Sequence, residues 1–254
     1  MFPEAHLWNL IIPMYPLLVA SGFLVGTVIA VMLGKMIDFS ENYVFILMCW
    51  VEFGVIAGGK LLYLIVNIQK LNQYFETVGF IGLFTKTGFV FYGGFLGGIL
   101  AVLLFSKLKK ISFTQSLSLV ITVTPLIHTF GRIGCFCAGC CYGKEWHGDF
   151  AVFIHGADRF PVQLLEASAN LFLFILLFVL FYRLSKARTI VIPAYLFSYG
   201  LIRFITEMFR GDVSRGYVGF LSVSSWISIL FVITGIIIFI MTFFQSKDIK
   251  NELN

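Results

Sequence analysis

The chain has 254 residues, of which 59% are hydrophobic and only 12% are charged, and its mean hydropathy is +0.95. A soluble domain carries about 25% charged residues, so this composition excludes an ordinary soluble protein. The net charge of +5 is spread over short connecting segments, which argues against nucleic-acid binding. The longest polar stretch, residues 144–159, is only a loop, so we expect one membrane-embedded domain over residues 1–254.

Apolar segments of membrane-spanning length recur along the whole chain. A helix that crosses a bilayer needs about 20 mostly apolar residues. The alternation of polar and apolar residues that a membrane barrel requires is absent. We therefore predict an all-α, polytopic membrane protein with about seven transmembrane helices. The predicted helices are Ile11–Leu33, Tyr43–Val66, Phe89–Phe105, Phe113–Ile133, Val162–Tyr182, Ile190–Phe209 and Val223–Phe244.

Basic residues after the third, fifth and last predicted helices orient the bundle. Segments rich in lysine and arginine stay on the cytoplasmic side of a membrane. The sequence therefore predicts an N-terminus outside the cell, a cysteine-rich segment on the same side, and a cytoplasmic C-terminus. The basic residues concerned are Lys107, Lys109, Lys110, Arg183, Lys186, Arg188, Lys247 and Lys250.

Glycines recur three or four residues apart in the second and third predicted helices. They include Gly54 and Gly58 in the second helix and four glycines within residues 93–98 in the third. Small residues at this spacing let two helices approach closely in a membrane. A second interpretation is that bare backbone lines a cleft for a lipid headgroup or substrate, because Lys60 and Tyr92 adjoin these glycines.

Ionisable side chains lie in or next to the predicted spans, where each costs about 2.5 kcal/mol or more. Arg203 and Glu207 are four residues apart, which places them on one helix face, and His128 and Arg132 have the same spacing. The full set is Glu52, Lys60, His128, Arg132, Glu166, Arg203, Glu207 and Arg210.

These charges have two interpretations. The first is a buried salt-bridge network that holds helices together. The second is a phosphate-binding site, because the arginines Arg132, Arg203 and Arg210 outnumber the obvious buried acids Glu166 and Glu207. A guanidinium pairs bidentately with phosphate oxygens. The apparent arginine excess favours a site for a phosphate head group near one membrane face.

Five segments in the same order resemble the prolipoprotein diacylglyceryl transferase family, and the resemblance covers nearly the whole chain. The family's GRIGNF motif is similar to residues 131–136, and its YPSQLYE motif is similar to residues 160–166. Its YGxxRFxxExxR motif is met in full by residues 199–210. Its GGR and HGG motifs are similar to residues 58–60 and 92–94.

The resemblance implies a thiol alkylation at the membrane surface, without metal or cofactor. A diacylglyceryl group would pass from phosphatidylglycerol to the lipobox cysteine of a preprolipoprotein, releasing glycerol 1-phosphate. The expected partners are phosphatidylglycerol, preprolipoprotein signal peptides and the lipid bilayer, with no nucleic acid. The expected location is the bacterial cytoplasmic (inner) membrane, with several spans. The acceptor thiol must lose its proton, and fixed donors must stabilise the departing phosphate.

The resemblance also implies roles for individual residues. Arg132 and Arg203 are expected to stabilise the phosphate, and Tyr92 or His128 would act beside them in catalysis. The residues expected to bind or orient substrate are Tyr15, Lys60, Gly93, Gly94, Gly131, Gly134, Cys135, Gly143, Gln163, Glu166, Tyr199, Glu207 and Arg210.

Four of the chain's departures from the family pattern change a side chain that could take part in the chemistry. Tyr92 stands where the family has histidine, and Lys60 stands where it has arginine. Cys135 replaces the asparagine of GRIGNF, and Cys140 replaces a motif glutamate. Tyrosine titrates near 10, so His128 is the alternative base. These departures leave two alternatives to the family's reaction. Either the chain acts on another lipid or thiol substrate, or it is a relative that binds lipid without catalysis.

Four cysteines, Cys135, Cys137, Cys140 and Cys141, lie within seven residues. They have four interpretations: small apolar residues or a disulfide in an oxidising exterior, a redox pair in the single Cys-x-x-Cys at residues 137–140, a metal site, or a covalent intermediate. We expect no metal, because zinc sites usually space two cysteine pairs well apart. The redox interpretation of these cysteines makes a membrane thiol–disulfide oxidoreductase the second candidate function. A secondary transporter is a third, although no inverted repeat is visible.

Overall fold

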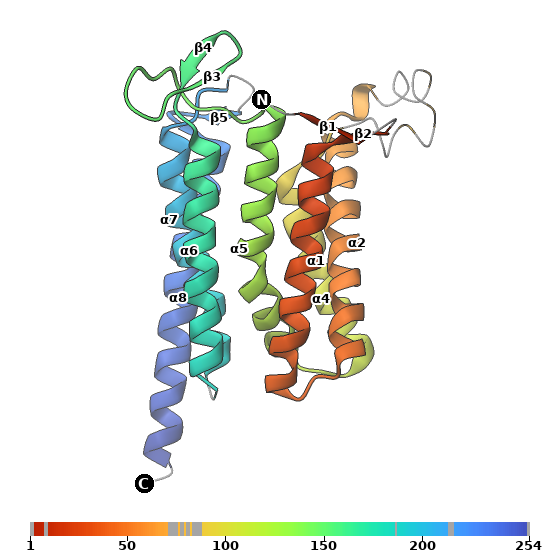
Figure 1. Cartoon of the computed structure of the whole chain (residues 1–254). Helices are drawn as coiled ribbons and strands as arrows, with labels where there is room; N and C mark the ends of the chain where they lie inside the picture. Colours follow the sequence, from red (N-terminus) through yellow and green to blue (C-terminus); the bar gives the residue numbers. More distant parts are fainter. Residues whose placement is uncertain are drawn as a thin grey trace. The chain divides into compact units, whose positions relative to one another are not determined.

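A computed structural model describes residues 3–7, 10–70, 76, 79, 82, 88–185, 187–212 and 216–252. Within these residues, seven helical spans are long and apolar enough to cross a membrane, which confirms the predicted all-α polytopic class (Figure 1). The helices are α1 (Met14–Gly34), α2 (Glu41–Val66), α4 (Phe91–Lys109), α5 (Phe113–Ala138), α6 (Val162–Arg183), α7 (Val191–Met208) and α8 (Val223–Glu252). Single 3-10 turns lie at Lys35–Ile37, Ile68–Lys70 and Arg188–Ile190.

Short antiparallel strand pairs lie outside the helices. Their bounds are β1 (Glu4–Leu7) with β2 (Leu10–Pro13), β3 (Val152–Ile154) with β4 (Ala157–Arg159), and β5 (Tyr217–Val218) with β6 (Leu221–Ser222). The first pair corrects the predicted start of the first helix at Ile11, because α1 begins only at Met14. Proline lacks an N–H donor and is tolerated in the first turn of a helix, where Pro16 lies.

The fourth helix is five residues longer than predicted. It continues past Ile133 to Ala138, where Gly139 adopts the left-handed conformation with φ of 72° and ends it. Cys135 and Cys137 therefore belong to α5, and Cys140 and Cys141 belong to the loop that follows.

The chain forms two compact units. One consists of Met1–Ala30 with Ser118–Asn254, and the other of Val31–Leu117. In the first unit α7 packs against α6 and α8, and α7 and α8 run side by side in Figure 1. In the second unit α2 packs against α4. The expectation of a single domain over residues 1–254 stays a prediction.

Glycines bring α2 and α4 into direct backbone contact. A Cβ atom added at Gly58 would overlap the carbonyl oxygen of Gly93, and one added at Gly97 would overlap that of Gly54. The Cβ position of Gly94 lies 2.7 Å from the Phe89 ring. Protein atoms thus fill the space that side chains would take, and close helix packing accounts for these glycines.

Glycines serve the same purpose in the first unit. Gly22 of α1 lies against Phe130 of α5, with 2.8 Å from an added Cβ to the Phe130 Cβ. Gly200 of α7 lies against the Ser228 carbonyl of α8, at 2.8 Å from its Cβ position. These contacts fix the helices that carry the charged residues described below.

We expect Gly58→Val to lower the free energy of unfolding by about 1–3 kcal/mol, because the added methyl groups would force α2 and α4 apart. The control is Ala57→Val, one position away on an exposed face of α2, which should leave stability nearly unchanged. Reversible unfolding of the detergent-solubilised protein measures both. Equal effects of the two variants would contradict the packing account.

Candidate active site

A continuous chain of ion pairs runs through the first unit. Nη2 of Arg132, on α5, lies 2.8 Å from one carboxylate oxygen of Glu166, on α6. The other oxygen of Glu166 lies 3.2 Å from Nη1 of Arg203, on α7. Nη2 of Arg203 lies 2.8 Å from the Glu207 carboxylate one turn further along α7. Glu166 thus joins three helices through two guanidinium groups.

The chain of ion pairs continues beyond the end of α7. Nη1 of Arg210 lies 3.8 Å from Glu207, while its Nε and Nη2 lie 2.9 and 2.6 Å from the two oxygens of Asp212. Asp212 was not among the predicted residues, because it lies outside the predicted span. It brings the acids to three, Glu166, Glu207 and Asp212, against three arginines, so the predicted arginine excess is wrong for this network. The sequence signal that could have identified Asp212 is its position two residues after Arg210.

Helical spacing places these groups on buried faces. On α6, Gln163 and Glu166 are three residues apart, and both lie on the face that is buried along the whole helix. On α7, Tyr199, Arg203 and Glu207 follow one another at intervals of four residues on the buried face. A buried charge is tolerated only with a partner of opposite charge. Each arginine of the network therefore needs its carboxylate.

Arg132 differs from the other two arginines of the network. Its side chain is 19% exposed, whereas that of Glu166 is 2% exposed. Among the described residues its one ion pair is with Glu166, although a guanidinium carries five N–H donors. The preceding residue, Gly131, has no atom within 4 Å of its Cβ position. Arg132 is therefore the most exposed arginine of the network, and it has fewer acidic partners among the described residues than Arg203 or Arg210.

Two aromatic residues and a histidine flank Arg132. Tyr15, in the first turn of α1, lies 3.1 Å from the Cβ position of Gly134 and within electrostatic reach of Arg132. The ring of His128 lies 5.3 Å from that of Tyr199, centroid to centroid. His128 is within electrostatic reach of both Arg132 and Glu166. The structure thus brings Tyr15, His128 and Tyr199 together with the ion-pair network.

The loop after α5 is attached to α6 and to the end of α7. The side-chain amide of Gln163 donates a hydrogen bond of 2.9 Å to the Cys140 carbonyl. Gly143 pairs with Arg210 in an isolated β-bridge, and a Cβ at Gly143 would overlap the Phe160 carbonyl oxygen. Glycine is therefore required at position 143, and the predicted residues Gln163 and Gly143 hold the loop in place.

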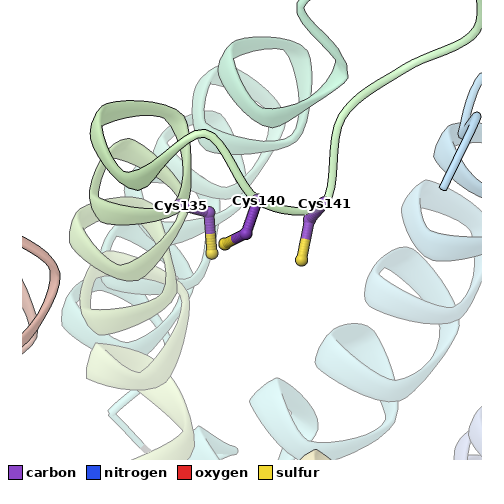
Figure 2. Close-up of side chains that lie close together, drawn as sticks. All are labelled: Cys135, Cys140 and Cys141. Carbon is purple, nitrogen blue, oxygen red and sulfur yellow. The ribbon is translucent and has the colours of Figure 1, made fainter. Parts of the chain in front are cut away.

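Three cysteine thiols converge at this loop. The Sγ atoms of Cys135, Cys140 and Cys141 lie within 4.8 Å of one another, and Figure 2 shows their side chains projecting to the same side. All five cysteines are free thiols in this structure, so it contains none of the disulfides that one interpretation of the sequence allowed. Among the described residues these three thiols have donor atoms close enough together to hold a metal ion. Cys137 does not belong to this group.

Hydrogen bonding within the cluster favours a thiolate. Hydrogen bonds from Cys135 and Cys140 hold the pKa of the Cys141 thiol well below its usual range. Burial opposes this effect, and the positive charges of Arg132 and Arg210 add to it. Of the three thiols, Cys141 is therefore the one whose ionised form is favoured.

Four predicted residues belong to the second unit and are described within it. Tyr92 lies in the first turn of α4, with its ring 5.7 Å from that of Phe91, and Lys60 is partly buried on α2. Gly93 and Gly94 are buried in the α2–α4 contact. Their part in a substrate site stays a prediction.

Removal of the shared carboxylate should destabilise the fold strongly. Glu166→Ala leaves two buried guanidinium groups without their common partner, so we expect a loss of about 3–5 kcal/mol in unfolding free energy. The matched control is Glu145→Ala, because Glu145 is 66% exposed and lies 3.8 Å from Arg159. That variant should lose less than about 1 kcal/mol. Similar losses in the two variants would show that the network does not stabilise the bundle.

Known proteins match this chain over nearly its whole length. The family model described as prolipoprotein diacylglyceryl transferase matches residues 5–241. The chain is 34% identical over 248 residues to the phosphatidylglycerol–prolipoprotein diacylglyceryl transferase of Clostridium tetani, with 95% of this chain and 98% of the relative covered. It is 31% identical over 247 residues to the Clostridium perfringens protein named phosphatidylglycerol–prolipoprotein diacylglyceryl transferase 2, with 92% of each covered. The Clostridioides difficile transferase of the same name is 30% identical over 253 residues, with 98% of this chain and 96% of the relative covered. The chain therefore belongs to the prolipoprotein diacylglyceryl transferase family.

Proposed function

We propose that this chain transfers the diacylglyceryl group of phosphatidylglycerol to the lipobox cysteine thiol of a preprolipoprotein and releases glycerol 1-phosphate. Family membership over residues 5–241 makes it a transferase, and the relatives cited above carry this donor and acceptor in their names. The observation that carries the proposal is Arg132, which lies on a candidate membrane span, is 19% exposed and has one ion pair among the described residues.

In this reaction negative charge develops on the departing phosphate group. The acceptor thiolate attacks the glyceryl carbon, the carbon–oxygen bond to phosphate breaks, and its electron pair stays on the phosphate oxygen. Arg132 would donate to that oxygen while its other edge remains on Glu166. Donors already oriented toward the developing charge stabilise the transition state without rearranging. Arg203 has a different role, because Glu166, Glu207 and Ser224 already engage its guanidinium, so it positions Glu166.

His128 and Tyr92 remain the candidates for the proton acceptor. His128 lies one helical turn before Arg132 and within its electrostatic reach, which supports a role next to the phosphate. The oxidoreductase alternative gains no support, because Cys137 of the Cys-x-x-Cys segment is outside the thiol cluster.

The proposal includes the location and orientation of the chain. We place it in the bacterial cytoplasmic (inner) membrane, with its N-terminus and the cysteine-containing loop outside and its C-terminus in the cytoplasm. Lys107 and Lys109 lie in the last turn of α4, and Arg183 ends α6, which agrees with the positive-inside rule. Phosphatidylglycerol and the signal peptide would then reach the network from the outer face.

A transfer assay tests the reaction. Purified protein in detergent receives phosphatidylglycerol and a lipobox peptide, and glycerol phosphate release is followed. Arg132→Ala should lower kcat/KM by about 100-fold or more, because the leaving group loses its donor. Arg132→Lys keeps the charge and loses the planar fork, so it should be intermediate. The control Arg183→Ala removes an exposed arginine and should retain activity. Full activity of Arg132→Ala would exclude the proposed role.

Reporter fusions test the orientation. Alkaline phosphatase is active outside the cytoplasm, so insertion after Asp149 should give active enzyme and insertion after Lys110 should not. Green fluorescent protein fused after Asn254 should fluoresce. The reverse pattern would contradict the proposed orientation and place the cysteine-containing loop in the cytoplasm.

A further inference from the structure

We propose that Cys135, Cys140 and Cys141 bind a thiophilic d10 metal ion of the zinc class, and that the open fourth position on this ion takes the acceptor thiol. The first part stands on the geometry of the three cysteines. The second part rests on the proposed transferase function.

The sulfur positions fit such an ion closely. Tetrahedral zinc with bonds of about 2.3 Å to sulfur needs sulfur atoms about 3.8 Å apart. The three Sγ atoms already lie within 4.8 Å of one another, so metal binding needs each pair to close by about 1 Å at most. Figure 2 shows the side chains directed to a common side.

The end of α5 brings the first two thiols together. The N–H of Gly139 donates to the Phe136 carbonyl at 3.2 Å, and the N–H of Cys140 donates to the Cys135 carbonyl at 3.1 Å. These two bonds, with Gly139 left-handed, form a Schellman motif. In this motif the side chains at the two positions that Cys135 and Cys140 occupy contact each other. The backbone alone therefore juxtaposes these two cysteines.

The third thiol depends on an unusual backbone conformation. Cys141 has φ of 57°, in the left-handed region that residues other than glycine adopt rarely. Hydrogen bonds fix the loop on both sides of it, from Gln163 to the Cys140 carbonyl and from the Gly211 N–H to the Tyr142 carbonyl at 3.0 Å. Such strain persists where surrounding structure imposes it and is concentrated at functional sites.

A metal ion accounts for this cluster better than packing or a disulfide. Cys140 is exposed, so burial of apolar surface does not explain it. A disulfide would use two thiols and leave the third without a role. Thiolate ligands select soft or borderline ions such as Zn²⁺ over Mg²⁺ or Ca²⁺. Three thiolates and one divalent ion leave a single negative charge, and Arg132 and Arg210 lie within electrostatic reach of Cys141 to balance it.

Three protein ligands are typical of catalytic zinc sites, which keep the fourth position for a reacting group. The acceptor thiol would bind there and release its proton to water, because a thiol coordinated to zinc is deprotonated. The bound thiolate would then attack the glyceryl carbon, and the electron pair of the broken carbon–oxygen bond would leave on glycerol 1-phosphate. The thioether product is a weaker ligand and departs. The metal and its three cysteines finish unchanged, and no oxidant is consumed.

This role would compensate for a departure from the family pattern. Tyr92 stands where the family motif has histidine, and a metal ion lowers the need for a protein base to deprotonate the thiol. Cys135 and Cys140 stand at two motif positions where the family has asparagine and glutamate. The substitutions at these three positions would then together provide a different way to activate the acceptor thiol.

Metal binding is tested first on the full chain in detergent. After incubation with Zn²⁺ and removal of the excess, elemental analysis should find stoichiometric zinc, and Co²⁺ should give thiolate-to-metal charge-transfer absorption. Cys135→Ser, Cys140→Ser and Cys141→Ser should each lose both signals, while the control Cys137→Ser should keep them. Because Cys140 is exposed, Cys140→Ser tests the site without disturbing the core. Absence of stoichiometric zinc in the wild type, equal loss in Cys137→Ser, or a disulfide in place of reactive thiols would overturn the site.

The role of the open position is tested in the transfer assay. Removal of zinc with a chelator should lower transfer at least about tenfold, zinc should restore it, and the lipobox peptide should shift the Co²⁺ spectrum. Transfer that persists without metal would overturn this role and leave the transferase intact. Stoichiometric zinc in a wild-type chain with no transfer would overturn the proposed function and leave the metal site. The Arg132→Ala variant should bind zinc but show no transfer, which separates the metal site from the transferase activity.

Discussion

The carboxylate of Glu166 is the group on which the arrangement of this bundle depends. It is buried, and it accepts from Arg132 on one helix and from Arg203 on another, at 2.8 and 3.2 Å. Without it Arg132 would lose its one ion pair among the described residues, and Arg203 would keep its contact with Glu207. An uncompensated buried charge destabilises a fold by several kcal/mol. The same contact bears on the proposed function. It engages Nη2 of Arg132 and is the one ion pair of that guanidinium among the described residues. Under the proposed function, one network would both stabilise the bundle and bind the phosphate, so the two interpretations of the charged residues concern the same groups.

Hydropathy and motif spacing predicted much of this arrangement from the sequence. The seven spans follow from apolar runs of bilayer length, and intervals of four residues placed Arg203 and Glu207 on one face of α7. Other features could not be predicted, because they depend on contacts between elements or on local backbone conformation. Asp212 neutralises Arg210 from a loop, beyond any helical pattern. Cys141 joins the thiol cluster only because its backbone is left-handed, which the Cys-x-x-Cys spacing does not indicate. The β1–β2 pair shortened the first helix, although its apolar residues match those of a span.

The family pattern and the departures from it meet at the same place. Residues 131–136 supply Arg132 and, one turn further along the helix, Cys135, the first cysteine of the cluster. The loop that follows is held by Gln163 from α6 and by the bridge between Gly143 and Arg210, so residues of two other motifs hold the loop that carries Cys140 and Cys141. Replacement of an amide and a carboxylate by sulfur changes the chemistry available at this position.

The central claim is that Glu166 orients Arg132 for the departing phosphate, and a double-mutant cycle on transfer activity tests it most directly. Arg132→Ala, Glu166→Gln and the double variant would be compared with the wild type by kcat/KM for phosphatidylglycerol, in chains shown to be folded. The account predicts strong coupling, because once Arg132 is absent Glu166 has nothing left to orient, so the double variant should be little worse than Arg132→Ala alone. Interaction energies between contacting residues reach about 0.5–3 kcal/mol. Additive losses in the double variant would contradict the account and would mean that the two residues act separately.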